Sequence, residues 1–415
     1  MAKNNDIVVS LDLGTTKICS LVGKLNNGAL DIVGVGSHPS GGIKRGVIID
    51  IDSTVDAMKK AVTEAELMSG YKITNVYVGI SGSHIQSSNE EGQYSLKGQP
   101  VTQKDIDKAV ELAQSARVVE ANRKLIHVEK RDFIVDGEKD IKNPLGIPGH
   151  RLESRVHVVT ASIASVDNIR RCVEGQGLRI NDIILESIAS SCAVLTEEEK
   201  ELGVVLLDIG GGTCDMSIFF EGSIVYSAVI PIGGSNITQD ISYCMRTSPA
   251  VAEEFKKNHG YALARMVSKD EFIDIPLVGG KTAQQIPKGA LAEIIEDRME
   301  QLFNFVAEEI RKSGYADHVS SGIVMTGGTS LLRGIKESAE IFFDVPVRLG
   351  RPVNFGVLKN IVSNPIYSTA VGLIMYAVKR DLSDDGYLVV KGSNLYNRVK
   401  NQVRGIYKRI EKEYF

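Results

Sequence analysis

The sequence has no tryptophan among its 415 residues, and cysteine and histidine are scarce. The five cysteines are scattered and odd in number, which predicts a reducing compartment rather than a disulfide framework. The seven histidines form no HExxH or similar pair, so no familiar metal-ligand spacing is present. These absences argue against a disulfide-rich secreted protein and against a metal site built from histidine and cysteine.

Long apolar runs and a strong excess of one charge are also missing. The opening "MAKNNDIVVS" is too polar for a signal peptide, and "IYSTAVGLIMYAV" (366–378) spans about 13 residues where a bilayer requires about 20. The net charge of −4 argues against bulk nucleic-acid binding. We therefore expect an ordinary globular protein without a membrane span, and its length predicts two or more domains.

One motif occurs twice in the chain. "IVVSLDLGTTKICSLVG" (7–23) and "LLDIGGGTCDMSI" (206–218) both pass from an apolar strand through aspartate, glycine and small hydroxyl residues into a second strand. Asp12 and Asp208 are 196 residues apart, nearly half the chain. Each motif continues into a β-meander and then a helical pattern. Such a duplication predicts two α/β lobes with a cleft between them.

The two aspartate-glycine turns have the composition of a phosphate clamp. A Gly/Thr turn exposes backbone N–H groups to anionic oxygens, and glycine admits a phosphate without a Cβ clash. The aspartates would repel phosphate directly but can hold it through hydrated Mg²⁺. A single such motif reads equally well as a hairpin turn with a solvated acid, whereas two matching motifs favour a clamp around a polyphosphate.

A third glycine-rich turn follows the apolar run of "GIVMTGGTSLLRGI" (322–335). Gly327 and Gly328 are suited to lie against the flat face of an adenine or a ribose. A plain strand-to-helix turn is the alternative interpretation of this segment.

Together these motifs resemble the actin/Hsp70/sugar-kinase ATPase superfamily. "DLGTTK" is similar to its first phosphate loop, "LLDIGGGTCDMSI" to its second and "MTGGTSLLRGI" to its adenosine loop. "IILESIASSCAVL" (183–195) and "YSTAVGLIMYA" (367–377) resemble its two connecting segments. Within the superfamily, almost the whole chain resembles the FtsA family of bacterial cell-division actin homologues.

The resemblance implies an α/β fold of the actin-like ATPase type, with two duplicated lobes around a nucleotide cleft. It also implies an inserted α+β subdomain of the 1C type and a C-terminal amphipathic helix. In lobe 1, the implied core (1A) covers 1–82 and 166–200, the insertion (1C) covers 83–165, and the chain returns to this lobe over 353–379. In lobe 2, the implied core (2A) covers 201–241 and 311–352, and subdomain 2B covers 242–310. A linker over 380–394 and the helix over 395–415 follow.

The cofactors implied by the resemblance are ATP and Mg²⁺. Asp12 and Asp208 would hold Mg²⁺ through water, and Glu186 would orient the attacking water, although it could equally be a capping acid. Glu253 and Lys256 would contact the nucleoside, unless they form only a surface ion pair. The remaining implied nucleotide contacts are Gly14, Thr15, Thr16, Lys17, Gly210, Gly211, Gly212, Thr213, Gly234, Gly327, Gly328 and Thr329. Nucleotide binding is implied, while hydrolysis beyond a weak ATPase activity is left open.

The family's partners come with the same resemblance. Arg298, within the amphipathic pattern of 288–310, would bind the C-terminal tail of the tubulin-like division protein FtsZ, unless it is only a solvated helix charge. Filaments of the protein itself and contacts of the insertion with later division proteins are also implied, whereas nucleic acid is not. A pilus-assembly actin-like adaptor, or another ATPase or kinase of the superfamily, is the alternative.

The C-terminal segment carries its own signal. Its apolar residues are spaced four, four, three, four and four, which places them on one stripe of a helix. They are Leu395, Val399, Val403, Ile406, Ile410 and Tyr414. The other faces carry six lysines and arginines against two glutamates. This pattern predicts peripheral attachment to anionic lipids on the cytoplasmic face of the cell membrane, and a helix packed on its own domain is the alternative. The family resemblance implies that this attachment is at the division site.

Overall fold

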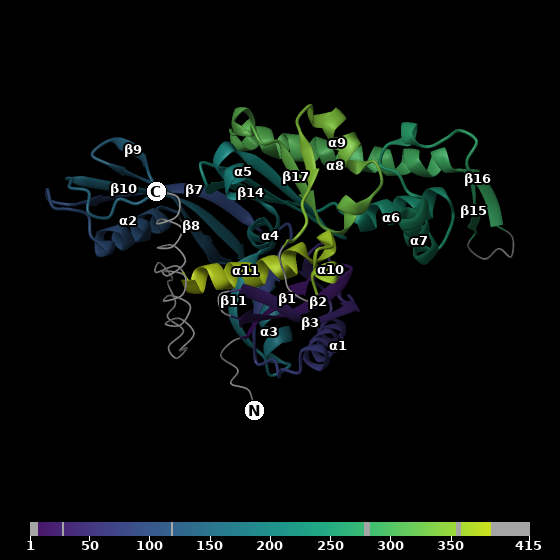
Figure 1. Ribbon diagram of the computed structural model, residues 1–415, viewed down its shortest axis with the longest axis horizontal. Helices are drawn as coiled ribbons and strands as arrows, with labels where there is room; N and C mark the ends of the chain where they lie inside the picture. The colour runs from purple at the N-terminus through teal and green to yellow at the C-terminus, as the bar shows by residue number, and fades with distance from the viewer. Residues whose placement is uncertain (1–6, 27–28, 118, 278–282, 354–357, 383–415) are drawn as a thin grey trace.

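The computed structural model describes residues 7–26, 29–117, 119–277, 283–353 and 358–382. The predicted linker and membrane-binding helix lie almost entirely outside these ranges. Two five-stranded sheets, an inserted four-stranded sheet and a set of connecting helices make up the fold (Figure 1). The inserted sheet and the β15–β16 hairpin lie at opposite ends of the long axis.

The first sheet has the strand order β11-β6-β1-β2-β3. β1, β2 and β3 form the predicted antiparallel meander, while β6 and β11 continue the sheet in parallel. The strands are β1 (Ile7–Leu13), β2 (Lys17–Asn26), β3 (Ala29–Pro39), β6 (Asn75–Ile80) and β11 (Arg179–Leu185). Helix α1 (Ile51–Ser69) packs on β3 and β2, and the short strands β4 (Ile43–Lys44) and β5 (Val47–Ile48) precede it.

The second sheet repeats this arrangement with the order β14-β13-β12-β17-β18. Its strands are β12 (Val204–Ile209), β13 (Cys214–Phe220), β14 (Ser223–Ile230), β17 (Ile323–Thr326) and β18 (Val347–Leu349). Again three strands form an antiparallel meander and two are added in parallel. Asp12 on β1 and Asp208 on β12 both lie on the central strand of their sheet, so the predicted duplication is confirmed.

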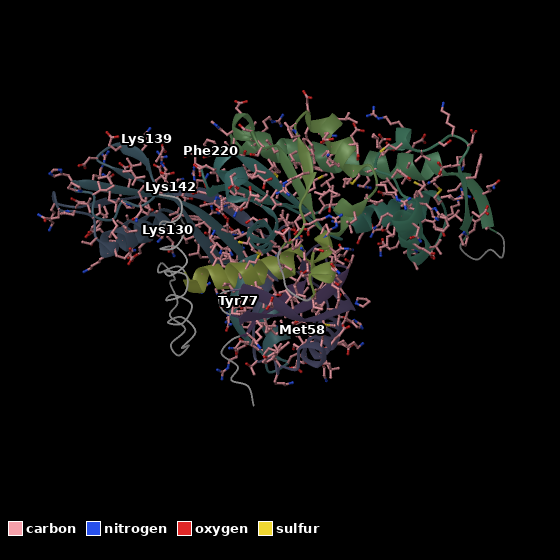
Figure 2. All side chains as sticks on the ribbon, in the orientation of Figure 1. Met58, Tyr77, Lys130, Lys139, Lys142 and Phe220 are labelled. Atoms are coloured by element: carbon pink, nitrogen blue, oxygen red, sulfur yellow. The ribbon has the colours of Figure 1, made fainter. Side chains whose placement is uncertain are left out.

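The inserted subdomain is a sheet of order β7-β10-β8-β9 with one helix against it. Its elements are β7 (Gln86–Ser95), α2 (Gln103–Ala116), β8 (Arg123–Val135), β9 (Glu138–Ile141) and β10 (Arg151–Ser162). It has small apolar clusters of its own, and it contacts lobe 2 through polar groups. Lys142 donates to the carbonyl of Glu221, next to Phe220 (Figure 2), and Arg131 donates to Tyr315 Oη at 2.7 Å.

Helices join and cover the two lobes. They are α3 (Ile163–Glu174), α4 (Glu186–Val194), α5 (Glu197–Leu202), α6 (Gly234–Cys244), α7 (Pro249–His259), α8 (Lys288–Ser313), α9 (Ile335–Phe343), α10 (Lys359–Val362) and α11 (Ser368–Leu382). The hairpin of β15 (Phe272–Pro276) and β16 (Ala283–Pro287) leads into α8. Among the helices that the structure describes, none combines the length and the apolar character that crossing a membrane requires.

The two connecting segments form a crossed helix pair, α4 and α11, which belong to the core of lobe 1 and reach the edge of lobe 2. Their backbones approach so closely that a Cβ on Gly372 would clash with the carbonyl of Ala189. A glycine is therefore required at this crossing, which fixes how α11 lies across α4.

Candidate functional site

Four carboxyl groups converge where the two lobes meet. Asp12, near the end of β1, faces Asp208 of β12 and Asp215 of β13, and Glu186 begins α4 beside them. Burial, opposed by Lys17 and reinforced by Asp208, raises the pKa of Asp12 to about 6. Burial also raises the pKa of Asp208. Burial raises the pKa of Glu186 well above its ordinary value, and the charges of Asp215, Asp12 and Asp208 raise it further.

Asp208 is held by lobe 1 although it belongs to lobe 2. Ser190 of α4 and Thr369 of α11 both donate to Asp208 Oδ2, the latter at 3.0 Å. The two hydroxyls also lie 3.2 Å from each other. The connecting helices therefore orient the predicted Mg²⁺-binding carboxylate from the opposite side of the cleft.

The two predicted phosphate loops are in direct contact. A Cβ on Gly211 would clash with Thr16, and one on Gly212 would clash with Thr15. In this structure the glycines make room for the threonines of the opposite loop. A phosphate placed between the loops would take the position that these threonine side chains now fill, so nucleotide entry requires the loops to separate.

The predicted nucleoside residues meet on the lobe 2 side of the cleft. Gly234 N–H donates to the carbonyl of Gly210 at 3.0 Å, and Thr329 Oγ1 donates to the same carbonyl at 2.8 Å. Lys256 Nζ donates to the carbonyl of Gly234 at 2.9 Å and pairs with Glu253 at 2.6 Å. The third glycine turn, the second glycine loop and α7 are thus brought together in the fold.

The neighbouring glycines of the third loop have different surroundings. Gly327 has φ +84°, and a Cβ there would clash with Asp208. The corresponding atom on Gly328 would lie 3.6 Å from Ile366, which is an ordinary contact. Glycine is therefore required at 327 by its own conformation, whereas at 328 a Cβ would meet only an ordinary contact.

Lys17 is the clearest indication of an anionic ligand. Its Nζ is buried and, among the described residues, has no hydrogen-bond partner, although it lies 4.2 Å from the centre of the Tyr367 ring. A buried ammonium group without hydrogen bonds is unfavourable unless a ligand completes its surroundings. The site therefore fits a phosphate at Lys17. Among the described residues no group of three or more His, Cys, Asp or Glu could ligate a metal ion directly, so a cation beside Asp12 and Asp208 would be held through water.

Asp215 is a member of this site that the sequence interpretation missed. It accepts a hydrogen bond of 2.6 Å from Ser81, which follows β6 in lobe 1. Burial raises the pKa of Asp215 to about 7, opposed by that hydrogen bond and reinforced by Asp208. One signal in the sequence could have identified it. Asp215 is a charged residue within β13, a strand whose residues are almost all buried.

Glu186 lies over Gly79 of β6. A Cβ added to Gly79 would lie 3.2 Å from Glu186 Oε1. Its carboxyl group accepts no hydrogen bond from the described part of the chain, and it faces the three aspartates. The capping interpretation is not supported, because α4 has no side-chain cap at its first turn.

Arg298 lies on α8 and is already paired within the chain. Its guanidinium donates to both oxygens of Asp240 on α6, at 2.6 and 2.7 Å, and to Gln301. The apolar stripe predicted for the C-terminal segment, from Leu395 to Tyr414, lies outside the described residues.

Comparison with known proteins agrees with this architecture. Residues 205–372 match the family model "Cell division protein FtsA", and 82–160 match "SHS2 domain inserted in FTSA". The chain is 44% identical to the cell division protein FtsA of Pseudomonas aeruginosa over 393 residues, covering 94% of both chains. It is 39% identical to the protein of that name from Escherichia coli K12, covering 92% and 93%.

Two solved structures confirm the actin-like fold. A type IV pilus biogenesis complex of PilM and PilN contains a chain with a TM-score of 0.61 and 16% identity, with coverage of 89% of this chain and 98% of that chain. MreB5 of Spiroplasma citri bound to ADP has a TM-score of 0.56 and 15% identity, with coverage of 92% and 100%.

Proposed function

The chain belongs to the FtsA family of cell division proteins, and from this premise we propose that it binds ATP–Mg²⁺ between its lobes and links the FtsZ polymer to the cytoplasmic membrane. The observation that carries the nucleotide site is the buried Nζ of Lys17, which has no hydrogen-bond partner in the described part of the chain and lies beside two converging glycine loops. Nucleotide binding is further supported by structures of Spiroplasma citri MreB5 with ADP and with AMPPNP.

The residues of this site are proposed to have the following roles. Asp12 and Asp208 would hold Mg²⁺ through water, and the bound ion would neutralise the phosphate charge. Lys17 would donate to a phosphate oxygen, together with N–H groups of the two glycine loops. Gly234 and Thr329, with Glu253 and Lys256, would border the nucleoside.

Glu186 is proposed to orient a water molecule for slow ATP hydrolysis. Its carboxyl group is free of hydrogen bonds among the described residues, so it can accept one from water. Because its pKa is raised by burial and by Asp215, Asp12 and Asp208, a cation at the site would favour the ionised form that this role requires.

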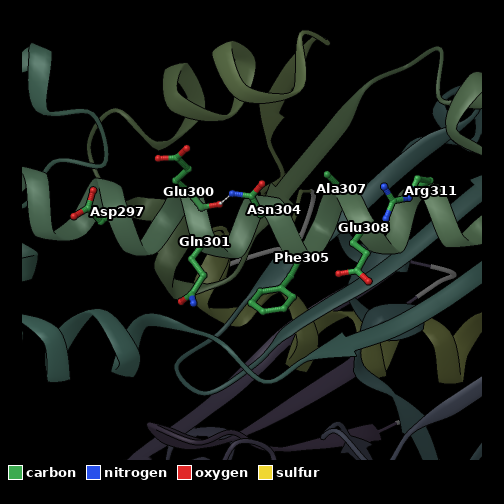
Figure 3. A pocket seen from close by; sticks show the side chains of 8 residues that line it. All are labelled: Asp297, Glu300, Gln301, Asn304, Phe305, Ala307, Glu308 and Arg311. Atoms are coloured by element: carbon green, nitrogen blue, oxygen red, sulfur yellow. Dashed lines mark hydrogen bonds between the residues drawn. The ribbon is translucent and has the colours of Figure 1, made fainter.

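The exposed face of α8 is proposed to receive the FtsZ tail. An open hollow of about 610 Å³ is lined along this helix by Asp297, Glu300, Gln301, Asn304, Phe305, Ala307, Glu308 and Arg311 (Figure 3). Phe305 is 42% exposed there and offers an apolar anchor. Arg298 precedes Phe305 by about two turns of α8. It would supply the cation for an acidic peptide by exchanging part of its pairing with Asp240.

Self-association and recruitment complete the proposal. The inserted subdomain would form the longitudinal filament contact and bind later division proteins, since it has small apolar clusters of its own and extends away from the two lobes. The boundaries stated from the sequence, including 2B at 242–310 and the linker at 380–394, are retained as part of this proposal. A pilus adaptor is less favoured, because identity to the matched chain of the PilM–PilN pilus complex is 16% against 39–44% to the division proteins.

Membrane attachment is assigned to residues 395–415, on the sequence pattern alone. One tail would bind reversibly, because an isolated helix of about 20 residues is marginally stable in water, and a filament would bind firmly through many tails.

Co-sedimentation with anionic vesicles tests this attachment. The full chain should sediment, and removal of 395–415, or replacement of Val403 and Ile406 by glutamate, should leave it in the supernatant with nucleotide binding intact. Replacing the basic Lys400 and Lys408 by glutamine should reduce binding on anionic vesicles more than on neutral ones. Equal sedimentation of the truncated and full chains would refute the attachment.

A further inference from the structure

A histidine of the inserted subdomain holds the backbone beside Glu186. β11 is an edge strand of the first sheet, and the N–H of its last residue, Leu185, donates to His127 Nε2 at 2.9 Å. His127 projects from β8 and is 5% exposed. A side chain of the inserted sheet therefore takes the place that a neighbouring strand would otherwise fill.

This hydrogen bond fixes the tautomer of His127. Because a backbone N–H can only donate, Nε2 must be the unprotonated acceptor, and the proton lies on Nδ1. Nδ1 faces Glu129 Oε1 at 3.5 Å, and Tyr376 of α11 donates to the same oxygen at 3.3 Å. Burial alone would raise the pKa of Glu129, but His127 and Tyr376 bring it below its ordinary value, so Glu129 is an anionic acceptor.

The position of Glu186 depends on this backbone. Its carboxyl group has no hydrogen bond within the described ranges, and α4 begins at Glu186 without a side-chain cap. What determines where the carboxyl group lies is the Leu185–Glu186 peptide above and the close surface of Gly79 below. At this junction the Leu185 N–H donates its hydrogen bond to the His127 side chain.

We propose that His127, held in its Nδ1–H tautomer by Glu129 and Tyr376, is a positioning residue that fixes the strand-to-helix junction from which Glu186 reaches the cleft. This inference rests on the proposed role of Glu186 in ATP hydrolysis. It also gives the inserted subdomain a part in the nucleotide site, through β8, without a contact to the nucleotide itself.

Two substitutions of the full-length protein separate positioning from packing. His127→Gln keeps an acceptor for Leu185 N–H and a donor for Glu129, whereas His127→Leu fills similar space with neither. Single-turnover hydrolysis of radiolabelled ATP with Mg²⁺, and the affinity for a fluorescent ATP analogue, are measured for both. We expect the leucine variant to hydrolyse ATP about tenfold more slowly or worse, the glutamine variant to stay within about threefold of wild type, and both to bind the analogue within about twofold.

Tyr376→Phe, which removes one donor to Glu129 without leaving a large cavity, should slow hydrolysis by about two- to threefold. Equal rates for the leucine and wild-type proteins would overturn the proposal, as would equal losses in the leucine and glutamine variants or a parallel loss of affinity.

Hydrogen exchange distinguishes this inference from the proposed role of Glu186. If Glu186→Gln hydrolyses ATP as wild type does, the role of Glu186 fails. Exchange of the Leu185 amide then decides whether His127 holds the junction. It should be protected in wild type and in His127→Gln, and exchange at least about tenfold faster in His127→Leu. Unchanged protection in the leucine variant would overturn the positioning role independently of hydrolysis.

Discussion

The most informative side chains of this protein are four buried carboxyl groups beside Lys17, whose Nζ has no hydrogen-bond partner among the described residues. Because these groups are buried close together, they repel one another when they ionise, which destabilises the folded protein. A cation at the proposed site would offset that cost. The stability of the protein without a bound cation therefore depends on pH in a direction that can be worked out.

Asp215→Asn should stabilise the ligand-free protein at pH 8. The pKa of Asp215 is about 7 in the fold against 3.8 for an unperturbed aspartate, so the folded state holds the proton more tightly. The contribution of this group to stability is therefore full below about pH 4 and is lost as the pH rises through about 7. The asparagine variant avoids that loss and keeps an acceptor for Ser81.

Thermal unfolding in EDTA provides the measurement. We expect a higher midpoint than wild type at pH 8, by about 2 °C or more, and little difference at pH 4.5. Asp167→Asn, at an exposed position of α3, should show neither change. A lower midpoint at pH 8, or the same shift at both pH values, would contradict the assignment of Asp215.

Individual residues could be singled out from the sequence where their type was unusual for the position. Asp12 and Asp208 stand out because an acid lies near the end of a largely apolar strand, and Gly327 stands out because a pair of glycines directly follows one. Ser81 and His127 do not stand out, since their roles depend on partners 134 and 58 positions away, Asp215 and Leu185. Such pairings are created by the fold and leave no periodic pattern in the chain.

The crossing of α4 and α11 is the element on which the orientation of Asp208 depends. Gly372→Ala should push the helices apart, because the added methyl group would clash with the carbonyl of Ala189. We expect a loss of about 1–3 kcal/mol in stability and a weaker response to ATP–Mg²⁺. Differential scanning fluorimetry with and without the nucleotide measures both.

Gly289→Ala, in the first turn of α8 where a Cβ meets nothing within 4 Å, is the matched control and should be neutral or slightly stabilising. If both glycine variants behaved alike, the close crossing would not be what constrains position 372.

The pairing of Arg298 with Asp240 makes the role of α8 testable. If Arg298 binds an acidic FtsZ peptide, Asp240→Asn should release its guanidinium and strengthen binding, while Arg298→Gln should weaken it. Lys312→Gln, near the C-terminal end of the same helix, is the control and should have little effect. Fluorescence anisotropy with a labelled FtsZ tail peptide measures the affinities. Weakening by both Asp240→Asn and Arg298→Gln would indicate that the ion pair only supports the fold.

Elements were predictable from the sequence wherever their periodicity was strong. Both meanders, the long helix α8 and the helix of the inserted subdomain occur close to the predicted positions, because their apolar spacing matches the faces they bury. The polar contact of the inserted sheet with lobe 2 was not predictable, since groups such as Lys142 and Arg131 look like ordinary surface charges.

Considered as a whole, the molecule places one central aspartate-bearing strand in each lobe and joins the lobes through α4 and α11. The two phosphate loops touch in this structure, through Thr15 and Thr16 against Gly211 and Gly212. A nucleotide bound between them, as proposed, would displace these threonine side chains. The inserted subdomain contacts both lobes, with β8 against β11 of lobe 1 and β7 and β8 against β14 of lobe 2.

Equilibrium binding of a fluorescent ATP analogue, with and without Mg²⁺, tests the central claim most directly. Wild type should bind more tightly with Mg²⁺, and Lys17→Met and Asp208→Asn should each weaken that binding by about tenfold or more. Lys312→Met, an exposed lysine on α8, should bind as wild type does. If both cleft variants are folded and bind the analogue with unchanged affinity, the nucleotide does not lie between these two loops.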